Sequence, residues 1–218
     1  MLYISMLLFK MNKIVWVFLF VLALFIPLLI YMIPKDLIIV LSGSKKTFET
    51  NEYYRTVCPY TFISCTTFTL PFHDNTNPFF IWNQTGMETI IQMSNNEIDK
   101  LKKKHNPRRL ILSGMSRGGY LAMMYEHADV YLLFSPVVKW SELDEFTDPG
   151  PRIPVDHLIK ARVFGFVNDK DYRINGSVVV NFFEKIQTKN NKFIIEKSDL
   201  HSVPPIIFEV AADFAYGI

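Results

Sequence analysis

The sequence predicts an α/β domain with a mostly parallel central sheet and helices on both faces, preceded by one N-terminal transmembrane helix. Short apolar runs alternate with helical patterns from residue 37 to residue 216, as in parallel sheets whose strands are buried on both faces. Residues 14–33 are twenty consecutive uncharged residues, enough to cross a hydrocarbon layer of about 30 Å. We therefore expect a short N-terminal tail (residues 1–13), an anchor (14–33) and one globular domain (34–218).

The apolar run at 14–33 is interpreted as a retained anchor. A cleaved signal peptide would be shorter and end in a small-residue cleavage site, and a small domain rarely buries a helix that is apolar on all sides. Lys10 and Lys13 precede the run, which predicts a single-pass membrane protein with a cytosolic N-terminus and a lumenal or extracellular domain. Lys45 and Lys46 follow closely enough to weaken this bias. In such a compartment Cys58 and Cys65 could form a disulfide, or they remain half-buried thiols.

Charge beyond the anchor is balanced. Two of the 23 Lys and Arg residues, Lys10 and Lys13, precede Pro34, so the remaining 21 offset the 21 Asp and Glu residues. A nucleic-acid-binding domain would carry a clear basic excess or stripe. Nucleic acid is therefore not expected as a partner.

The first half of the domain contains three predicted strands and two predicted helices. Residues 37–41 are wholly apolar, and residues 66–70 are rich in Thr and Phe, so both predict strands. Residues 87–104 have apolar side chains at helical spacing and predict a helix, which is either continuous or broken at 94–96. The apolar run 110–112 predicts a strand that is followed, after a turn, by a helix from about residue 120 to 125.

The second half continues the alternation. Strands are predicted at 130–134, 161–167 and 192–196, separated by a proline-rich excursion over 140–154 and by a helix at 177–187 with Ser177 as a possible N-cap. A closing helix is predicted from about residue 205 to 216, because Pro205 suits a first helical turn. In open parallel sheets, chemistry gathers where the strands end.

A Gly-x-Ser-x-Gly pattern follows the strand at 110–112. In Gly114-Met115-Ser116-Arg117-Gly118 the chain leaves a strand, turns and enters a helix, which is the context of a nucleophile elbow. The glycines are expected because a Cβ there would collide with the neighbouring strand or helix. Ser116 is the candidate nucleophile, and the helix after it would direct N–H groups at a developing negative charge.

A serine nucleophile needs a base and an acid that orients the base. The five histidines are His73, His105, His127, His157 and His201. His201 is preferred, because it follows the last predicted strand and precedes the closing helix. Asp171 is preferred as the acid, with Asp169 as the alternative, because both follow the strand at 161–167 and Asp171 leaves room for a short turn.

The order Ser116, Asp171, His201, together with the elbow Gly-Met-Ser-Arg-Gly-Gly, resembles the α/β-hydrolase superfamily. The segment Val-Asn-Asp-Lys-Asp-Tyr-Arg-Ile at 167–174 is similar to the family's strand-turn-Asp element. The resemblance covers about residues 37–216, as a minimal version of the fold whose first strands are missing or replaced by the anchor. The loop Ser42-Gly43-Ser44 departs from the His-Gly-Gly run of many lipases and esterases.

This resemblance implies a serine hydrolase that cleaves an ester, thioester or amide, with carboxylesterase or lipase chemistry favoured over peptidase chemistry. With the anchor predicted at 14–33, the enzyme would be membrane-anchored. The amides of Arg117 and of Ser44 or Gly43 would form the oxyanion hole. The substrate would be a small or lipid-like acyl compound, and neither a metal nor an organic cofactor is required. The alternative is an inactive hydrolase-fold protein that binds or scaffolds at a membrane.

Overall fold

The computed structural model describes residues 15–25, 35–41, 63–68, 85–139 and 150–217. The chain forms two compact units, Met1–Pro34 and Lys35–Ile218. Gly43, Ser44, Cys58 and His73 lie outside the described residues, as do parts of the predicted anchor and excursion.

The first unit contains a described helix over residues 15–25. Its large apolar side chains face solvent, with Trp16 69%, Phe18 63% and Phe20 66% exposed. The predicted span of 14–33 extends beyond the described residues at both ends. Among the helices that the structure does describe, none combines the length and the apolar character needed to cross a membrane.

The second unit is built on a six-stranded sheet in the order β2-β1-β3-β4-β5-β6. Every neighbouring pair of strands is parallel, as expected for short apolar strands separated by helices. The strands are β1 (Asp36–Leu41), β2 (Ile63–Phe68), β3 (Leu110–Met115), β4 (Val130–Phe134), β5 (Arg162–Asn168) and β6 (Lys192–Glu196). Their carboxyl ends therefore share one edge, and β3, β4, β5 and β6 are consecutive there.

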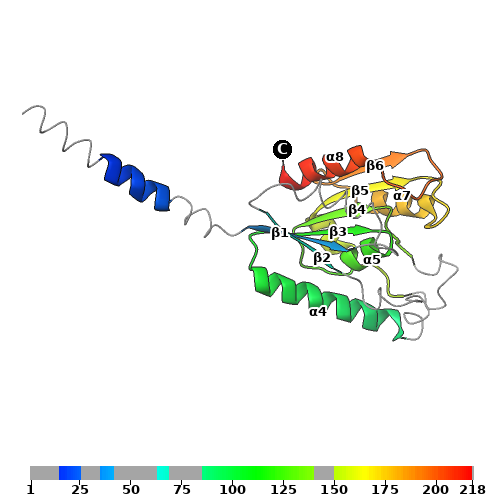
Figure 1. Cartoon of the computed structure of the whole chain (residues 1–218). Helices are drawn as coiled ribbons and strands as arrows, with labels where there is room; N and C mark the ends of the chain where they lie inside the picture. The colour runs from blue at the N-terminus through cyan, green and yellow to red at the C-terminus, as the bar shows by residue number, and fades with distance from the viewer. Residues whose placement is uncertain (1–14, 26–34, 42–62, 69–84, 140–149, 218) are drawn as a thin grey trace, which may run out of the picture. The chain divides into compact units, whose positions relative to one another are not determined.

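Helices cover both faces of this sheet (Figure 1). One core unites the helices α4 to α7 with alternate strand residues such as Leu37, Ile39 and Leu41. On the opposite face, α8 packs over Ile38 and Val40 and their neighbours. This alternation follows from the period of two along a strand. The helices are α4 (Met87–His105), α5 (Arg117–Met123), α6 (Asp156–Lys160), α7 (Gly176–Lys185) and α8 (Pro205–Tyr216).

The structure corrects several local predictions. Helix α4 is continuous through 94–96, where the sequence left a break undecided. The buried Ser94 hydroxyl is satisfied within the helix, since it donates a hydrogen bond of 2.8 Å to the carbonyl of Ile90. Helix α7 begins at Gly176 with Asn175 as its N-cap, so the prediction of Ser177 at that position was wrong; the Ser177 hydroxyl instead donates to Asn175 Oδ1. Strand β2 begins three residues earlier than expected, and α6 was not predicted.

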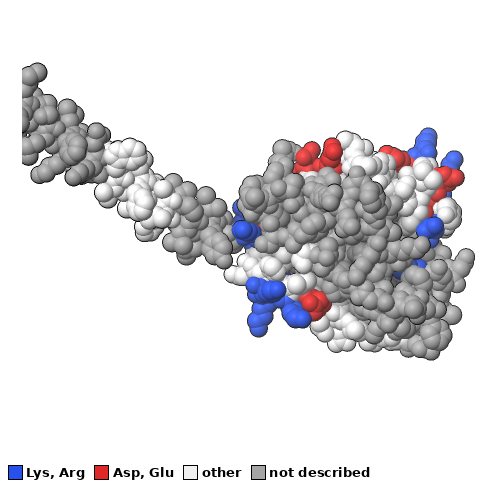
Figure 2. Space-filling model, in the orientation of Figure 1, with Lys and Arg blue, Asp and Glu red and all other residues white. Residues whose placement is uncertain are grey.

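Figure 2 shows Lys and Arg as well as Asp and Glu side chains around the margin of the second unit. At the start of β1 the buried Asp36 carboxylate accepts hydrogen bonds from Arg108 Nε at 3.0 Å and Arg109 Nε at 3.0 Å. Burial by itself would raise the pKa of Asp36, but the hydrogen bonds from the two guanidinium groups hold it below its ordinary value. This cluster joins β1 to β3 at the edge of the sheet opposite the carboxyl ends of the strands.

Candidate active site

Ser116 lies at the turn between β3 and α5 in a strained backbone conformation. Its φ of 52° and ψ of −119° lie outside the regions that residues with a side chain prefer. The strain is held by neighbouring hydrogen bonds: Ser116 N donates to the carbonyl of Phe134, and the amides of Gly119 and Val137 donate to the Ser116 carbonyl, each at 3.0 Å. The turn is thus fixed both to its own helix and to the end of β4.

Two glycines make this turn sterically feasible. A Cβ on Gly114 would lie 2.4 Å from the carbonyl oxygen of Gly118, which is backbone and cannot swing away. A Cβ on Gly119 would lie 2.7 Å from Cβ of Pro136 in the segment after β4. The prediction that a Cβ would collide is therefore confirmed for Gly114. The second constrained glycine is Gly119, which follows the Gly118 of the predicted pattern.

The structure brings Asp171 and His201 together across 30 residues of chain. His201 Nδ1 lies 2.6 Å from Asp171 Oδ2, and the two side chains are 13% and 0% exposed. A short contact between an imidazole nitrogen and a buried carboxylate fixes the ring orientation and leaves Nε2 as the nitrogen that can exchange a proton with a substrate.

The loop after β5 holds the Asp171 carboxylate in place. Asp171 Oδ1 accepts a hydrogen bond of 3.0 Å from the amide of Arg173, and the Asp171 carbonyl accepts one of 3.0 Å from Gly176. Asp169 lies in the same loop, but its amide donates to Glu196 and its Oδ1 is buried with no hydrogen-bond partner. The carboxylate that contacts His201 is therefore that of Asp171 rather than that of Asp169.

Ser116, Asp171 and His201 all follow strands at the carboxyl edge of the sheet. Ser116 follows β3, Asp171 follows β5 two strands away, and His201 follows β6. With neighbouring strands roughly 4.8 Å apart, the ends of β3 and β5 are separated by about 10 Å along the edge. Within the described part of the chain no hydrogen bond joins Ser116 to His201; such contacts are often long before a substrate binds.

Arg117 is the first residue of α5, where helix amides point outward from the N-terminus. His105 and His127 are exposed, whereas His157 packs edge-on against the Tyr131 ring with its centroid 5.6 Å away. Burial lowers the pKa of His157.

Two buried polar residues at the same edge were not predicted from the sequence. Ser135 directly follows β4, is 0% exposed, has a φ of 42° and has a hydroxyl without a hydrogen-bond partner. Asn168 ends β5 and is 2% exposed. Their position in the sequence could have identified them, because each is the first polar residue after an apolar run, 130–134 for Ser135 and 163–167 for Asn168.

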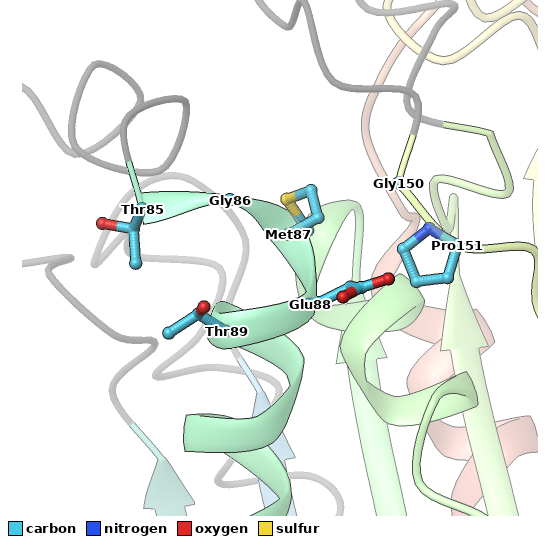
Figure 3. A pocket seen from close by; sticks show the side chains of 7 residues that line it. All are labelled: Thr85, Gly86, Met87, Glu88, Thr89, Gly150 and Pro151. Atoms are coloured by element: carbon cyan, nitrogen blue, oxygen red, sulfur yellow. The ribbon is translucent and has the colours of Figure 1, made fainter.

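A separate hollow of about 380 Å³ lies at the start of α4 (Figure 3). Residues 85–89 line one side of it, and Gly150 and Pro151 line the other. The Tyr120 hydroxyl, one turn along α5 from Ser116, donates a hydrogen bond of 2.7 Å to the Pro151 carbonyl and so connects this wall to the elbow helix. Among the described residues, no group of three His, Cys, Asp or Glu side chains is arranged to hold a metal ion.

Comparison with known proteins identifies the fold. No family model and no curated protein matches the sequence. TT1662 from Thermus thermophilus superposes with a TM-score of 0.68 and 12% identity over 84% of this chain and 89% of that one. A carboxylesterase from Mesorhizobium loti gives 0.58 and 14% identity, with 84% and 89% of the two chains covered.

A third similar structure is XC6422 from Xanthomonas campestris, described as an α/β serine hydrolase without a lid. It superposes with a TM-score of 0.55 and 12% identity over 84% of this chain and 81% of that one. At these identities the likeness concerns the fold alone. The second unit of this chain has the fold of the α/β hydrolases.

Proposed function

We propose that the protein is a serine hydrolase that cleaves an ester, thioester or amide through Ser116, His201 and Asp171. The observation that carries the proposal is the 2.6 Å contact between His201 and the buried Asp171 at the sheet edge where the strained Ser116 elbow lies. The esterase and hydrolase structures of the same fold support it by analogy.

In this mechanism His201 Nε2 accepts the Ser116 hydroxyl proton while Oγ attacks the substrate carbonyl carbon. The tetrahedral intermediate collapses as the imidazolium donates that proton to the leaving group, and an acyl-enzyme remains on Ser116. Water then attacks the acyl-enzyme while His201 Nε2 accepts a proton from it. The imidazolium returns that proton to Ser116 Oγ as the carboxylic acid is released. Asp171 stays ionised and stabilises the imidazolium in both halves of the reaction.

The oxyanion would be stabilised by the amide of Arg117 at the start of α5. A second donor from Ser44 or Gly43, which follow β1 in the sequence, belongs to the same proposal, and both residues lie outside the described part of the chain. Two such donors reduce the barrier because they face the charge that develops in the transition state.

The substrate is proposed to be a small or lipid-like acyl compound, cleaved without a metal or organic cofactor. The N-terminal segment supports a membrane location, because residues 14–33 are uncharged and the described helix exposes Trp16, Phe18 and Phe20. In this arrangement the N-terminus is cytosolic and the catalytic domain is lumenal or extracellular.

One observation favours a competing role as an inactive binding or scaffolding protein. The described residues include no hydrogen bond between Ser116 and His201, and a fold alone does not ensure turnover. Such a protein would keep the acid–base pair as a structural contact and would not activate Ser116.

Covalent labelling by a fluorophosphonate probe distinguishes the two roles. The hydrolase is expected to label at Ser116, with labelling lost in both Ser116→Ala and His201→Gln. Ser177→Ala serves as the matched control, because Ser177 is an exposed serine on α7 and its loss should leave labelling unchanged. Absence of labelling in folded wild-type protein would favour the scaffolding role.

A further inference from the structure

The Asn168 side chain holds the peptide on both sides of His201. Its amide nitrogen donates one hydrogen bond of 2.8 Å to the carbonyl of Leu200 and a second of 3.1 Å to the carbonyl of Ser202. These carbonyls belong to the residues immediately before and after His201. A primary amide has two N–H donors, and here both are used on the segment that carries the imidazole.

The orientation of this amide follows from its partners. If the group were rotated by 180°, Asn168 Oδ1 would face two carbonyl oxygens, which accept and cannot donate hydrogen bonds. Asn168 is 2% exposed, so water cannot readily replace the two bonds. Buried groups of this kind restrict a loop more strongly than exposed ones.

The same residue also positions the acid. The Asn168 carbonyl accepts a hydrogen bond of 3.1 Å from the amide of Asp171, which closes the turn that presents the carboxylate. Asp169 and Lys170 then donate to the carbonyls of Glu196 and Ser198 at 2.9 and 3.1 Å, which ties this turn to the segment leading to His201. Asn168 therefore contacts the supports of both members of the 2.6 Å pair.

We propose that Asn168 is a positioning residue that sets the location of the His201 imidazole relative to Asp171 and Ser116. The inference rests on the proposed function and adds to it a residue that restrains the backbone on both sides of the base, His201. During turnover the imidazole gains and loses a proton while Nδ1 stays with Asp171. A displacement of about 1 Å can reduce a rate about 100-fold, so a restraint on the backbone of the base contributes to kcat.

Asn191, the residue before β6, provides a matched control because its side chain bonds to the other end of β5. It is also buried, its Oδ1 accepts from Val163 N at 3.0 Å, and its Nδ2 donates to the Ile186 carbonyl at 2.6 Å. Val163 lies near the start of β5, whereas Asn168 ends it. Replacement of Asn191 thus removes a similar buried amide at the end of the strand remote from His201.

The test compares full-length wild type, Asn168→Leu, Asn168→Ser and Asn191→Leu. Leu has the same branching at Cγ as Asn but is larger and has no hydrogen-bond donor, while Ser is smaller and keeps one donor. With p-nitrophenyl acetate, kcat is expected to fall on the order of 10- to 100-fold in Asn168→Leu with KM changed less than about threefold, and to fall less in Asn168→Ser. Asn191→Leu should keep the wild-type kcat in its folded fraction.

A second measurement does not depend on turnover. The proton between His201 Nδ1 and Asp171 should give a low-field NMR resonance in wild type and Asn191→Leu that is weakened or lost in Asn168→Leu. Wild-type kcat and resonance in folded Asn168→Leu would overturn the inference, as would an equal loss in Asn191→Leu. If wild type neither turns over nor labels, the proposed function fails, and the resonance alone decides whether Asn168 positions His201.

Discussion

Replacement of Gly176 by alanine tests whether the acid depends on close packing of its loop. A Cβ at this position would lie 2.1 Å from the carbonyl oxygen of Asn168 and 2.8 Å from that of Asp169, whereas ordinary contact begins near 3.4 Å. All of these obstacles are backbone, so the loop must move by roughly 1 Å to accept the methyl group. The Gly176 amide also donates to the Asp171 carbonyl, and the movement therefore reaches the acid.

We expect Gly176→Ala to lower the free energy of unfolding by about 1–3 kcal/mol. For a domain of this size each kcal/mol corresponds to about 2–4 °C in Tm. The rate of fluorophosphonate labelling should fall on the order of 100-fold, because the base loses its fixed partner.

The control is Gly217→Ala at the end of α8. Gly217 has a φ of +75°, and a Cβ there would meet only Arg162 Nη1 at 4.0 Å. This variant is expected to lose about 1 kcal/mol from backbone strain and to label at the wild-type rate. Thermal unfolding and labelling kinetics measured on the same samples separate the two effects. Wild-type Tm and labelling in Gly176→Ala would refute the described packing of the β5–α7 loop.

Three further predictions concern charged and titratable groups. Asp171→Asn should reduce kcat on the order of 10³-fold or more, because the imidazolium loses its counter-charge. Asp169→Asn should change kcat less than about tenfold. If steady-state assays show the larger loss in Asp169→Asn, the acid is Asp169. Asp36→Asn should cost about 1–2 kcal/mol at neutral pH. Because the pKa of Asp36 is lowered in the folded protein, the difference in the free energy of unfolding between wild type and Asp36→Asn should shrink as pH falls below about 4. Urea unfolding at a series of pH values measures this difference, and a difference that stays constant would contradict the prediction. The pKa of His157 is lowered in the folded protein. The unfolded chain therefore binds a proton at His157 at a higher pH than the folded protein does, and the free energy of unfolding should decline as pH falls through about 6.5. Replacing His157 by Phe should flatten that part of the Tm profile, and an unchanged slope would rule out its contribution.

Local sequence patterns were sufficient to predict a helix or strand where all the residues that indicate it lie in one segment. The closing helix at 205–216 and the strand at 192–196 match α8 and β6 residue for residue, because spacing and a proline at the first turn are local properties. The elbow glycine Gly114 was also identifiable, since strand, Gly-x-Ser-x-Gly and helix are contiguous. The prediction of Ser177 as an N-cap was wrong, and the sequence left a break at 94–96 undecided. In both places a serine hydroxyl forms a local hydrogen bond, Ser177 to the Asn175 side chain and Ser94 to the Ile90 carbonyl.

The sequence by itself determined the parallel α/β class, the elbow and a short set of candidate bases and acids, because these depend on periodicity and on chain order. Only the tertiary structure decided that Asp171, and not Asp169, contacts His201, and that Asn168 spans the peptide around that histidine. These contacts join residues that are about 30 positions apart. They form only after β5 and β6 pair in their observed register, with Asn168 opposite Glu196, since this pairing brings the two loops to the same edge of the sheet.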